Sequence, residues 1–281
     1  MIFKKNVFII GGKHEKPILI DVTCLEKTTN TPIIIFCHGY KGFKDWGAWN
    51  LMAEAFAKAG FCFIKFNFSH NGGTMEQPID FPDLEAFGNN NYTKELDDLQ
   101  SVINWSFENE TIKSSGNLND ISLMGHSRGG GIVLLKAHNE SRVKKVISLA
   151  GVSDFLSRSV TSEGIEDWEK TGVKYVLNGR TKQKMPHYYQ FYLDTNKNRT
   201  PLNIKKAVSN LKIPHLIIHG DNDTSILINE AENLHKWNPD SSLVIIKNAN
   251  HVFESKHPWN YNHLPKELKE VVDKSIIFLK R

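Results

Sequence analysis

The sequence predicts an α/β fold with a mostly parallel central sheet of about eight strands, helices on both faces and a small inserted cap. Two observations support this. Short apolar runs alternate with helical patterns along most of the 281 residues, which is typical of parallel strands joined by crossover helices. One apolar run also passes through Gly125-His126-Ser127-Arg128-Gly129 directly into a helix. The length suits one large domain or at most two, and we expect a single domain over residues 1–281.

The expected strands are short, and most are bounded by glycine or polar residues. The run Ile33–Cys37 is wholly apolar, as expected for a strand buried on both faces of a parallel sheet. We expect the first two strands to form a hairpin that turns at Gly11-Gly12. In chain order the strands are expected at residues 7–10, 18–24, 33–37 and 61–66, from 121, and at residues 146–149, 216–219 and 243–247.

The helices are expected between these strands, where apolar residues recur at helical spacing. Gly60 ends one of them, and the helix of residues 92–108 carries acidic residues near its start, where the helix dipole favours them. The expected helices cover residues 48–59 and 92–108, the segment after Ser127, and residues 226–237 and 265–279.

The alternation stops between Ser153 and Asn210. This segment shows no clean strand but holds many aromatic side chains. We interpret residues 153–210 as an inserted, partly helical cap, after which alternating strands and helices resume.

Composition excludes several classes of partner. The formal net charge is only +4 and the lysines are scattered, without the basic stripe interleaved with aromatics that nucleic-acid binding favours. No segment has the length and apolarity of a membrane span, and the first residues lack the long apolar run of a signal peptide. Three cysteines lie in apolar runs without metal-ligand spacing: Cys24, Cys37 and Cys62. They predict buried thiols in a reducing compartment, and we expect the cytoplasm.

The motif around Ser127 predicts a nucleophile. A strand that reverses into a helix within a few residues brings backbone segments close together, and Gly125 and Gly129 remove the β-carbons that would clash there. Ser127 is then expected on a strained turn with its hydroxyl exposed.

A second strand ends in His38-Gly39 and could supply an oxyanion site. A glycine at this point lets the following backbone N–H groups point inward, and we expect the N–H groups of Tyr40 and Arg128 to be the two donors. The alternative interpretation is that Gly39 and Gly42 simply form a turn.

The acid and the base are expected after two later strands. Asp221 and Asp223 both follow the strand of residues 216–219; we take Asp223 as the acid that orients a histidine and Asp221 as a turn former, although an aspartate in such a loop can equally cap a helix. His251 follows the last strand and completes the order Ser, Asp, His. His126 is a weaker candidate because its side chain should point away from Ser127. Three other histidines also compete less well: His219, His257 and His263.

These segments together resemble the α/β-hydrolase superfamily over essentially the whole chain. The longer runs 38–47 and 66–72 resemble a serine esterase-like subgroup related to dienelactone hydrolases and acylaminoacyl peptidases. In that family the acid usually occupies the last position of Gly-x-x-Asp, which maps onto Asp223; some relatives place it after the preceding strand, where this chain has Asp154.

The resemblance and the residues predict a serine hydrolase that cleaves a carboxylic ester through an acyl-enzyme and requires no metal or organic cofactor. A peptidase or amidase, a thioesterase and a non-catalytic binding protein on the same fold are the alternatives. We expect a small or aromatic ester, although the cap aromatics could equally pack the cap onto the sheet. The candidate substrate contacts are His38, Ser69, His70, Asn71, Trp168, Tyr188 and Tyr189. The side chain of Arg128 is expected to be free to vary, since only its backbone N–H has a role.

Overall fold

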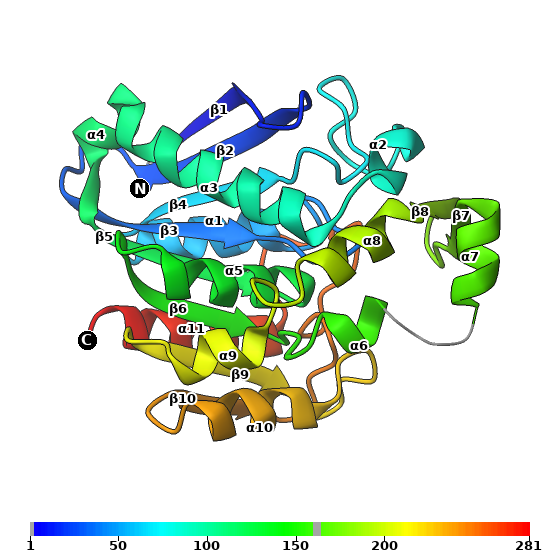
Figure 1. Ribbon diagram of the computed structural model, residues 1–281. Helices are drawn as coiled ribbons and strands as arrows, with labels where there is room; N and C mark the ends of the chain where they lie inside the picture. Colours follow the sequence, from blue (N-terminus) through cyan, green and yellow to red (C-terminus); the bar gives the residue numbers. More distant parts are fainter. Residues whose placement is uncertain (1–2, 160–163) are drawn as a thin grey trace.

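The computed structural model describes residues 3–159 and 164–281, which form one eight-stranded sheet (Figure 1). Its strands are β1 (Phe3–Gly11), β2 (Pro17–Leu25), β3 (Thr31–Cys37), β4 (Cys62–Asn67), β5 (Gly116–His126), β6 (Val143–Leu149), β9 (His215–Gly220) and β10 (Ser242–Ile246). Their order across the sheet is β1-β2-β4-β3-β5-β6-β9-β10. The pairs β1–β2 and β2–β4 are antiparallel, and all the following pairs are parallel.

The predicted α/β class and its mostly parallel sheet are therefore confirmed. The first two strands form the expected hairpin, with Gly11 paired to Pro17. β3 lies in the middle of the sheet, and Ile33–Cys37 are fully buried, as their apolar run predicts. The three cysteines are buried thiols, and Sγ of Cys24 lies 2.8 Å from Sγ of Cys62.

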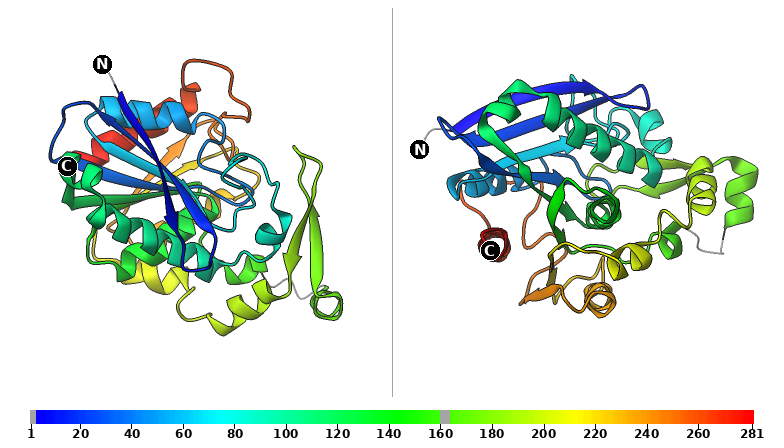
Figure 2. Two further views of the ribbon diagram at one scale, coloured as in Figure 1. Left: turned by 90° about the horizontal axis from the view of Figure 1, so that it is seen from above. Right: turned by 60° about the vertical axis from the view of Figure 1, so that its left-hand side comes forward.

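Helices cover both faces of the sheet (Figures 1 and 2). One face packs against α1 (Trp49–Lys58) and α11 (Lys266–Leu279), whose Trp49, Met52 and Leu268 share a core with Phe36 of β3. The other core contains apolar residues of α3 (Tyr92–Glu108), α4 (Glu110–Ser115), α5 (Arg128–Asn139), α9 (Ile204–Ser209) and α10 (Ile228–Trp237). A further short helix, α2 (Leu84–Gly88), follows β4 and precedes α3.

The segment expected to be a cap contains a β-hairpin as well as helices. Its elements before α9 are α6 (Leu156–Ser159), α7 (Ile165–Thr171), β7 (Val173–Leu177), β8 (Lys184–Tyr188) and α8 (Gln190–Lys197). Figures 1 and 2 show α7, β7 and β8 projecting beyond one end of the main sheet. Residues 160–163 of the expected cap lie outside the described residues.

The prediction that this segment lacks strands is thus wrong. β7 and β8 pair antiparallel, from Val173 with Tyr188 to Leu177 with Lys184. In the sequence of β7 Lys174 leaves only a short apolar run, and β8 contains Pro186, which is uncommon inside a strand. The turn had a signal in Asn178-Gly179: the Asn178 N–H donates to the Gln183 carbonyl at 2.8 Å, and its side-chain oxygen accepts from the Arg180 N–H at 3.0 Å.

α9 lies against the body of the fold. Ile204, Ala207 and Val208 are buried in the same core as α5. The part of residues 153–210 that projects from the sheet therefore ends before α9.

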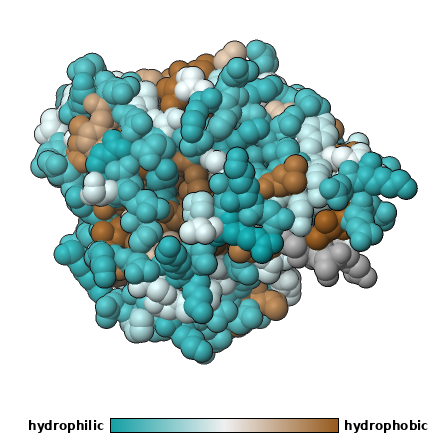
Figure 3. Space-filling model, viewed as in Figure 1, coloured by the Kyte–Doolittle hydropathy of each residue, from teal (hydrophilic) through white to brown (hydrophobic). Residues whose placement is uncertain are grey.

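Figure 3 shows a largely hydrophilic face on which hydrophobic residues form small separate groups. Among the described residues, no helix combines the length and apolarity needed to cross a bilayer.

The turn from β5 into α5 depends on two glycines. A β-carbon on Gly125 would lie 2.1 Å from the carbonyl oxygen of Gly129, and one on Gly129 would lie 2.4 Å from the carbonyl oxygen of Cys37. Both distances are far inside van der Waals contact with backbone that cannot move aside. The start of α5 therefore packs directly against the ends of β5 and β3.

Replacing Gly129 with alanine should lower the free energy of unfolding by about 2 kcal/mol or more, because the added carbon forces two backbone segments apart. Gly179→Ala is the matched control, since a β-carbon there meets nothing within 4 Å. It should change stability by less than about 0.5 kcal/mol. Urea denaturation of the two variants checks this, and equal stabilities would contradict the close-packing argument.

Candidate active site

Ser127 lies on a strained turn between β5 and α5. It is the residue that precedes α5, and its backbone angles are φ 56° and ψ −119°. A non-glycine residue adopts a positive φ at a cost, which is met only where the surroundings hold it in place. Here the Ser127 N–H donates to the Leu149 carbonyl at 2.9 Å, while its own carbonyl accepts from Gly130 at 2.9 Å.

The structure brings Ser127, His251 and Asp223 together from three separate loops. Ser127 Oγ lies 3.0 Å from His251 Nε2, and His251 Nδ1 lies 2.7 Å from Asp223 Oδ2. An ionised carboxylate can only accept, so His251 donates its Nδ1–H to Asp223. That tautomer leaves Nε2 with a lone pair facing the hydroxyl of Ser127, which is the arrangement a general base requires.

Asp223 is held as an anion. Its side chain is fully buried, which by itself would raise the pKa of the carboxyl group. The hydrogen bond from His251, together with those from the N–H groups of Ser225 and Ile226 at 2.8 and 2.9 Å, outweighs burial and lowers this pKa.

The two other candidate acids lie elsewhere. Asp154 is exposed, and its side-chain oxygen accepts from the nearby Leu156 N–H at 2.8 Å. Asp221 accepts from the Asn248 N–H at 2.6 Å and so fastens two loops, in keeping with its interpretation as a turn former. Of the three carboxylates, Asp223 contacts the His251 ring.

Two further buried histidines surround this group. His126 Nε2 lies 2.7 Å from the His251 carbonyl oxygen, and the two rings are 4.8 Å apart. Burial and the neighbouring His251 lower the pKa of His126 to about 3, so the ring is neutral and donates to that carbonyl. The sequence gives no sign of this contact between His126 and the His251 loop. His219 Nε2 lies 2.8 Å from the Ile226 carbonyl oxygen behind Asp223, and burial lowers its pKa as well.

The expected oxyanion donors lie beside Ser127. Arg128 is the first residue of α5, where helical N–H groups have no partner within the helix. The loop after β3 passes so close that a β-carbon on Gly39 would lie 2.9 Å from Cβ of Ser127. Tyr40, the next residue, follows directly on this contact and lines both cavities together with Ser127, so its N–H stays an expected donor.

The Arg128 side chain makes contacts that sequence analysis did not anticipate. Its Nη1 donates to Glu95 Oε1 at 3.2 Å, deep beneath the site. Its guanidinium also lies over three aromatic rings, 4.5 Å from the centre of Tyr40, 5.1 Å from Tyr92 and 5.6 Å from Phe191. The expectation that this side chain can vary freely conflicts with these contacts, since removing it would leave Glu95 buried without its cation.

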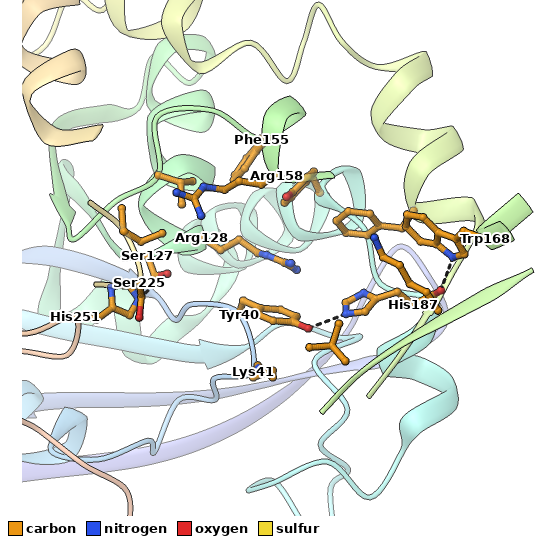
Figure 4. A pocket seen from close by; sticks show the side chains of 16 residues that line it. Tyr40, Lys41, Ser127, Arg128, Phe155, Arg158, Trp168, His187, Ser225 and His251 are labelled. Carbon is orange, nitrogen blue, oxygen red and sulfur yellow. Dashed lines mark hydrogen bonds between the residues drawn. The ribbon is translucent and has the colours of Figure 1, made fainter. Parts of the chain in front are cut away.

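Two cavities meet at Ser127. The larger, of about 470 Å³, extends from Ser127 and His251 past Tyr40 and Arg128 to His187 and Trp168 (Figure 4). The smaller, of about 190 Å³, also reaches Ser127 and is lined by Trp46, Trp49 and His126 among others. Tyr40, Lys41, Ser127 and His251 line both.

Of the expected substrate contacts, Trp168 alone lines one of these two cavities. Its indole N–H donates to the His187 carbonyl at 2.7 Å. Tyr189 packs against the Trp168 and Tyr192 rings instead, and the Tyr188 hydroxyl donates to Glu85. The interpretation that some cap aromatics pack the cap thus fits these two tyrosines.

The polar residues at the ends of β3 and β4 are used internally. His38 Nε2 accepts from the Phe68 N–H at 3.3 Å, and Ser69 Oγ lies 2.8 Å from His70 Nδ1. Asn71 donates to the Gly42 carbonyl at 3.2 Å. All four side chains are buried and none lines either cavity, so their predicted substrate contact is not supported by this geometry.

Comparison with known families matches residues 32–182, more than half of the chain, to the alpha/beta hydrolase fold. The chain belongs to this α/β hydrolase family. The resemblance that the motifs predicted is confirmed, and the eight-stranded sheet agrees with it.

Relatives of this α/β hydrolase are distant. An uncharacterised 31.7 kDa protein from the traX-finO intergenic region of Escherichia coli is 33% identical over 149 residues, 52% of this chain and 46% of that protein. The chain thus spans about half the length of the curated relatives it matches.

Solved structures share the fold at low identity. Est1E from Butyrivibrio proteoclasticus is 17% identical with a TM-score of 0.71 over 98% of both chains. The dienelactone hydrolase from Anabaena variabilis is 16% identical with a TM-score of 0.64, over 99% of this chain and 97% of that one.

The lowered pKa of Asp223 makes acid stability a test of the site. Its ionised form stabilises the folded state in full above the ordinary value of 3.8, and this contribution is lost as the pH falls through the lower folded-state pKa. The difference in unfolding free energy between wild type and Asp223→Asn should therefore shrink as the pH falls below about 4. Urea denaturation at a series of pH values measures it.

Asp154→Asn is the control for this measurement, because it removes an exposed carboxylate outside the cluster. Its difference from wild type should stay small and constant. If Asp223→Asn behaved in the same way, the carboxylate would not be held as described.

Proposed function

We propose that this protein is a serine hydrolase that cleaves a carboxylic ester through an acyl-enzyme. The observation that carries the proposal is the relay from Ser127 Oγ through His251 to buried Asp223, at the point where two cavities meet. A substrate bound at Ser127 would have both cavities available to its acyl and alcohol parts.

In the first step His251 Nε2 takes the Ser127 proton as Oγ attacks the ester carbonyl carbon. The carbonyl oxygen becomes an oxyanion, which the N–H groups of Tyr40 and Arg128 would bind. When the intermediate collapses, the bond to the leaving oxygen breaks and His251 passes the proton to the departing alcohol. Asp223 stabilises the imidazolium that exists in between.

In the second step a water molecule enters where the alcohol left. His251 removes its proton, the water oxygen bonds to the acyl carbon, and the bond to Ser127 Oγ breaks. The proton returns to Oγ and the acid is released. The neutral ring of His126, bonded to the His251 carbonyl, keeps the base in one position through both steps.

The walls of the larger cavity favour an ester with an apolar or aromatic part. Tyr92, Phe155 and Phe191 line it close to Arg128, and Trp168 closes its far end. Faces of this kind bind flat apolar groups well. This retains the small or aromatic ester as the proposed substrate class.

Ser127→Ala should lower kcat for para-nitrophenyl acetate by roughly 10⁴- to 10⁶-fold, because nucleophilic attack is lost while binding remains. A fluorophosphonate probe should label the wild type and fail to label this variant. Ser225→Ala is the matched control: Ser225 lines the same cavity, and its variant should still be labelled. Labelling of Ser127→Ala at the wild-type rate would refute the assignment.

The choice between the two acids can be made with conservative variants. Asp223→Asn should lower kcat by roughly 10⁴-fold, because the histidine would then be held in the wrong tautomer. Asp154→Asn should retain most of the wild-type rate. Steady-state kinetics with one aryl ester measures both, and the reverse order would make Asp154 the acid.

A further inference from the structure

The larger cavity has an unbalanced charge. Of the lining residues in the described parts of the chain, four carry cationic side chains and none is acidic: Lys41, Arg128, Arg158 and Lys174. Two of these cations are compensated from behind the wall, Arg128 by Glu95 and Arg158 by Glu230.

The two lysines are not compensated in this way. Across residues 3–159 and 164–281, neither Lys41 nor Lys174 has a carboxylate partner. Each ammonium group instead lies by an aromatic ring, with Lys174 Nζ 3.7 Å from the centre of Trp168 and Lys41 Nζ 5.0 Å from that of Tyr40. The rings hold the cations in place and leave their N–H donors to bind an anion.

The two lysines come from different parts of the fold but line the same cavity. Lys41 follows β3 in the body and Lys174 lies on β7 of the projecting hairpin. Both are partly buried, which lowers the pKa of each by removing water from the charged form. An anion between them would supply the stabilisation that water has lost.

His187 is affected by three of these positive charges. It lies on β8, and its Nε2 is 2.7 Å from Tyr40 Oη (Figure 4). Burial lowers the pKa of His187 to about 3, and Arg128, Lys174 and Lys41 add to this in that order. The ring is therefore neutral, and it lies within electrostatic range of three cations that line the same cavity.

We propose that Lys41, Lys174 and Arg128 form an anion subsite around His187, and that the natural substrate is an ester carrying a separate carboxylate group. The scissile carbonyl lies at Ser127 and the carboxylate at the cap end of the cavity, with the apolar part between them on the aromatic wall. This deepens the proposed function and rests on it.

Two comparisons of a charged ester with its neutral methyl ester test the proposal. The first uses para-nitrophenyl monoesters of adipic to sebacic acid, in which the second carboxylate is either free or methylated, so the charge lies on the acyl part. The second uses para-acetoxybenzoate and its methyl ester, so the charge lies on the leaving group. In at least one pair the charged ester should have the higher kcat/KM, by about tenfold, as expected for a charge-assisted contact in a partly buried site.

The Lys41→Met/Lys174→Met double variant should lose this preference for the charged ester. Lys184→Met is the matched control, because Lys184 is exposed on β8 of the same hairpin and lines neither cavity, and it should keep the preference. The absence of a preference in both pairs, or a preference that survives in the double variant, would overturn the subsite.

Binding measured without turnover separates this inference from the proposed function. Calorimetric titration of Ser127→Ala with suberic acid should show binding, whereas dimethyl suberate should not bind. Adding Lys41→Met and Lys174→Met to the Ser127→Ala variant should abolish the binding of suberic acid. If the acid binds in this way but the wild type hydrolyses no ester, the proposed function fails while the subsite stands. If neutral esters are hydrolysed but the acid does not bind, only the subsite fails.

Discussion

The close approach of three backbone segments at Gly125 and Gly129 is the constraint on which the rest of the site depends. Because neither position has room for a β-carbon, α5 starts directly against the ends of β5 and β3. That contact holds Ser127 at a positive φ and presents the first N–H of α5 beside it. The loop that leads to Tyr40 meets Ser127 at the same place, since a β-carbon on Gly39 would lie 2.9 Å from Cβ of Ser127.

Buried polar groups hold the other half of the relay. Asp223 is fixed by hydrogen bonds from two backbone N–H groups. His251 is fixed by the hydrogen bond that its carbonyl oxygen accepts from the His126 ring. The His126 ring is neutral because it is buried, so it can donate to that carbonyl without placing a second positive charge beside the imidazolium. A residue next to Ser127 in sequence thus supports the base that comes from the far end of the chain.

The sheet and the relay could be predicted because their signals are local. Apolar runs mark strands, and glycine-bounded loops at strand ends mark Ser127, Asp223 and His251. The hairpin of β7 and β8 was missed because Lys174 leaves only a short apolar run in β7 and Pro186 interrupts the strand pattern of β8. The contacts of Arg128 with Glu95, and of Lys174 with Trp168, join residues on separate elements, so sequence spacing carries no trace of them. His126 was a weaker candidate in the sequence, and only the fold shows that its ring faces the loop of His251.

Tyr40 makes contacts toward both the candidate nucleophile and the cap. Its backbone N–H is an expected oxyanion donor, while its hydroxyl contacts His187 of the hairpin and its ring lies by Arg128. The candidate oxyanion loop and the hairpin that carries Lys174 are thus joined by one side chain, because Tyr40 comes from the loop after β3 and His187 from β8.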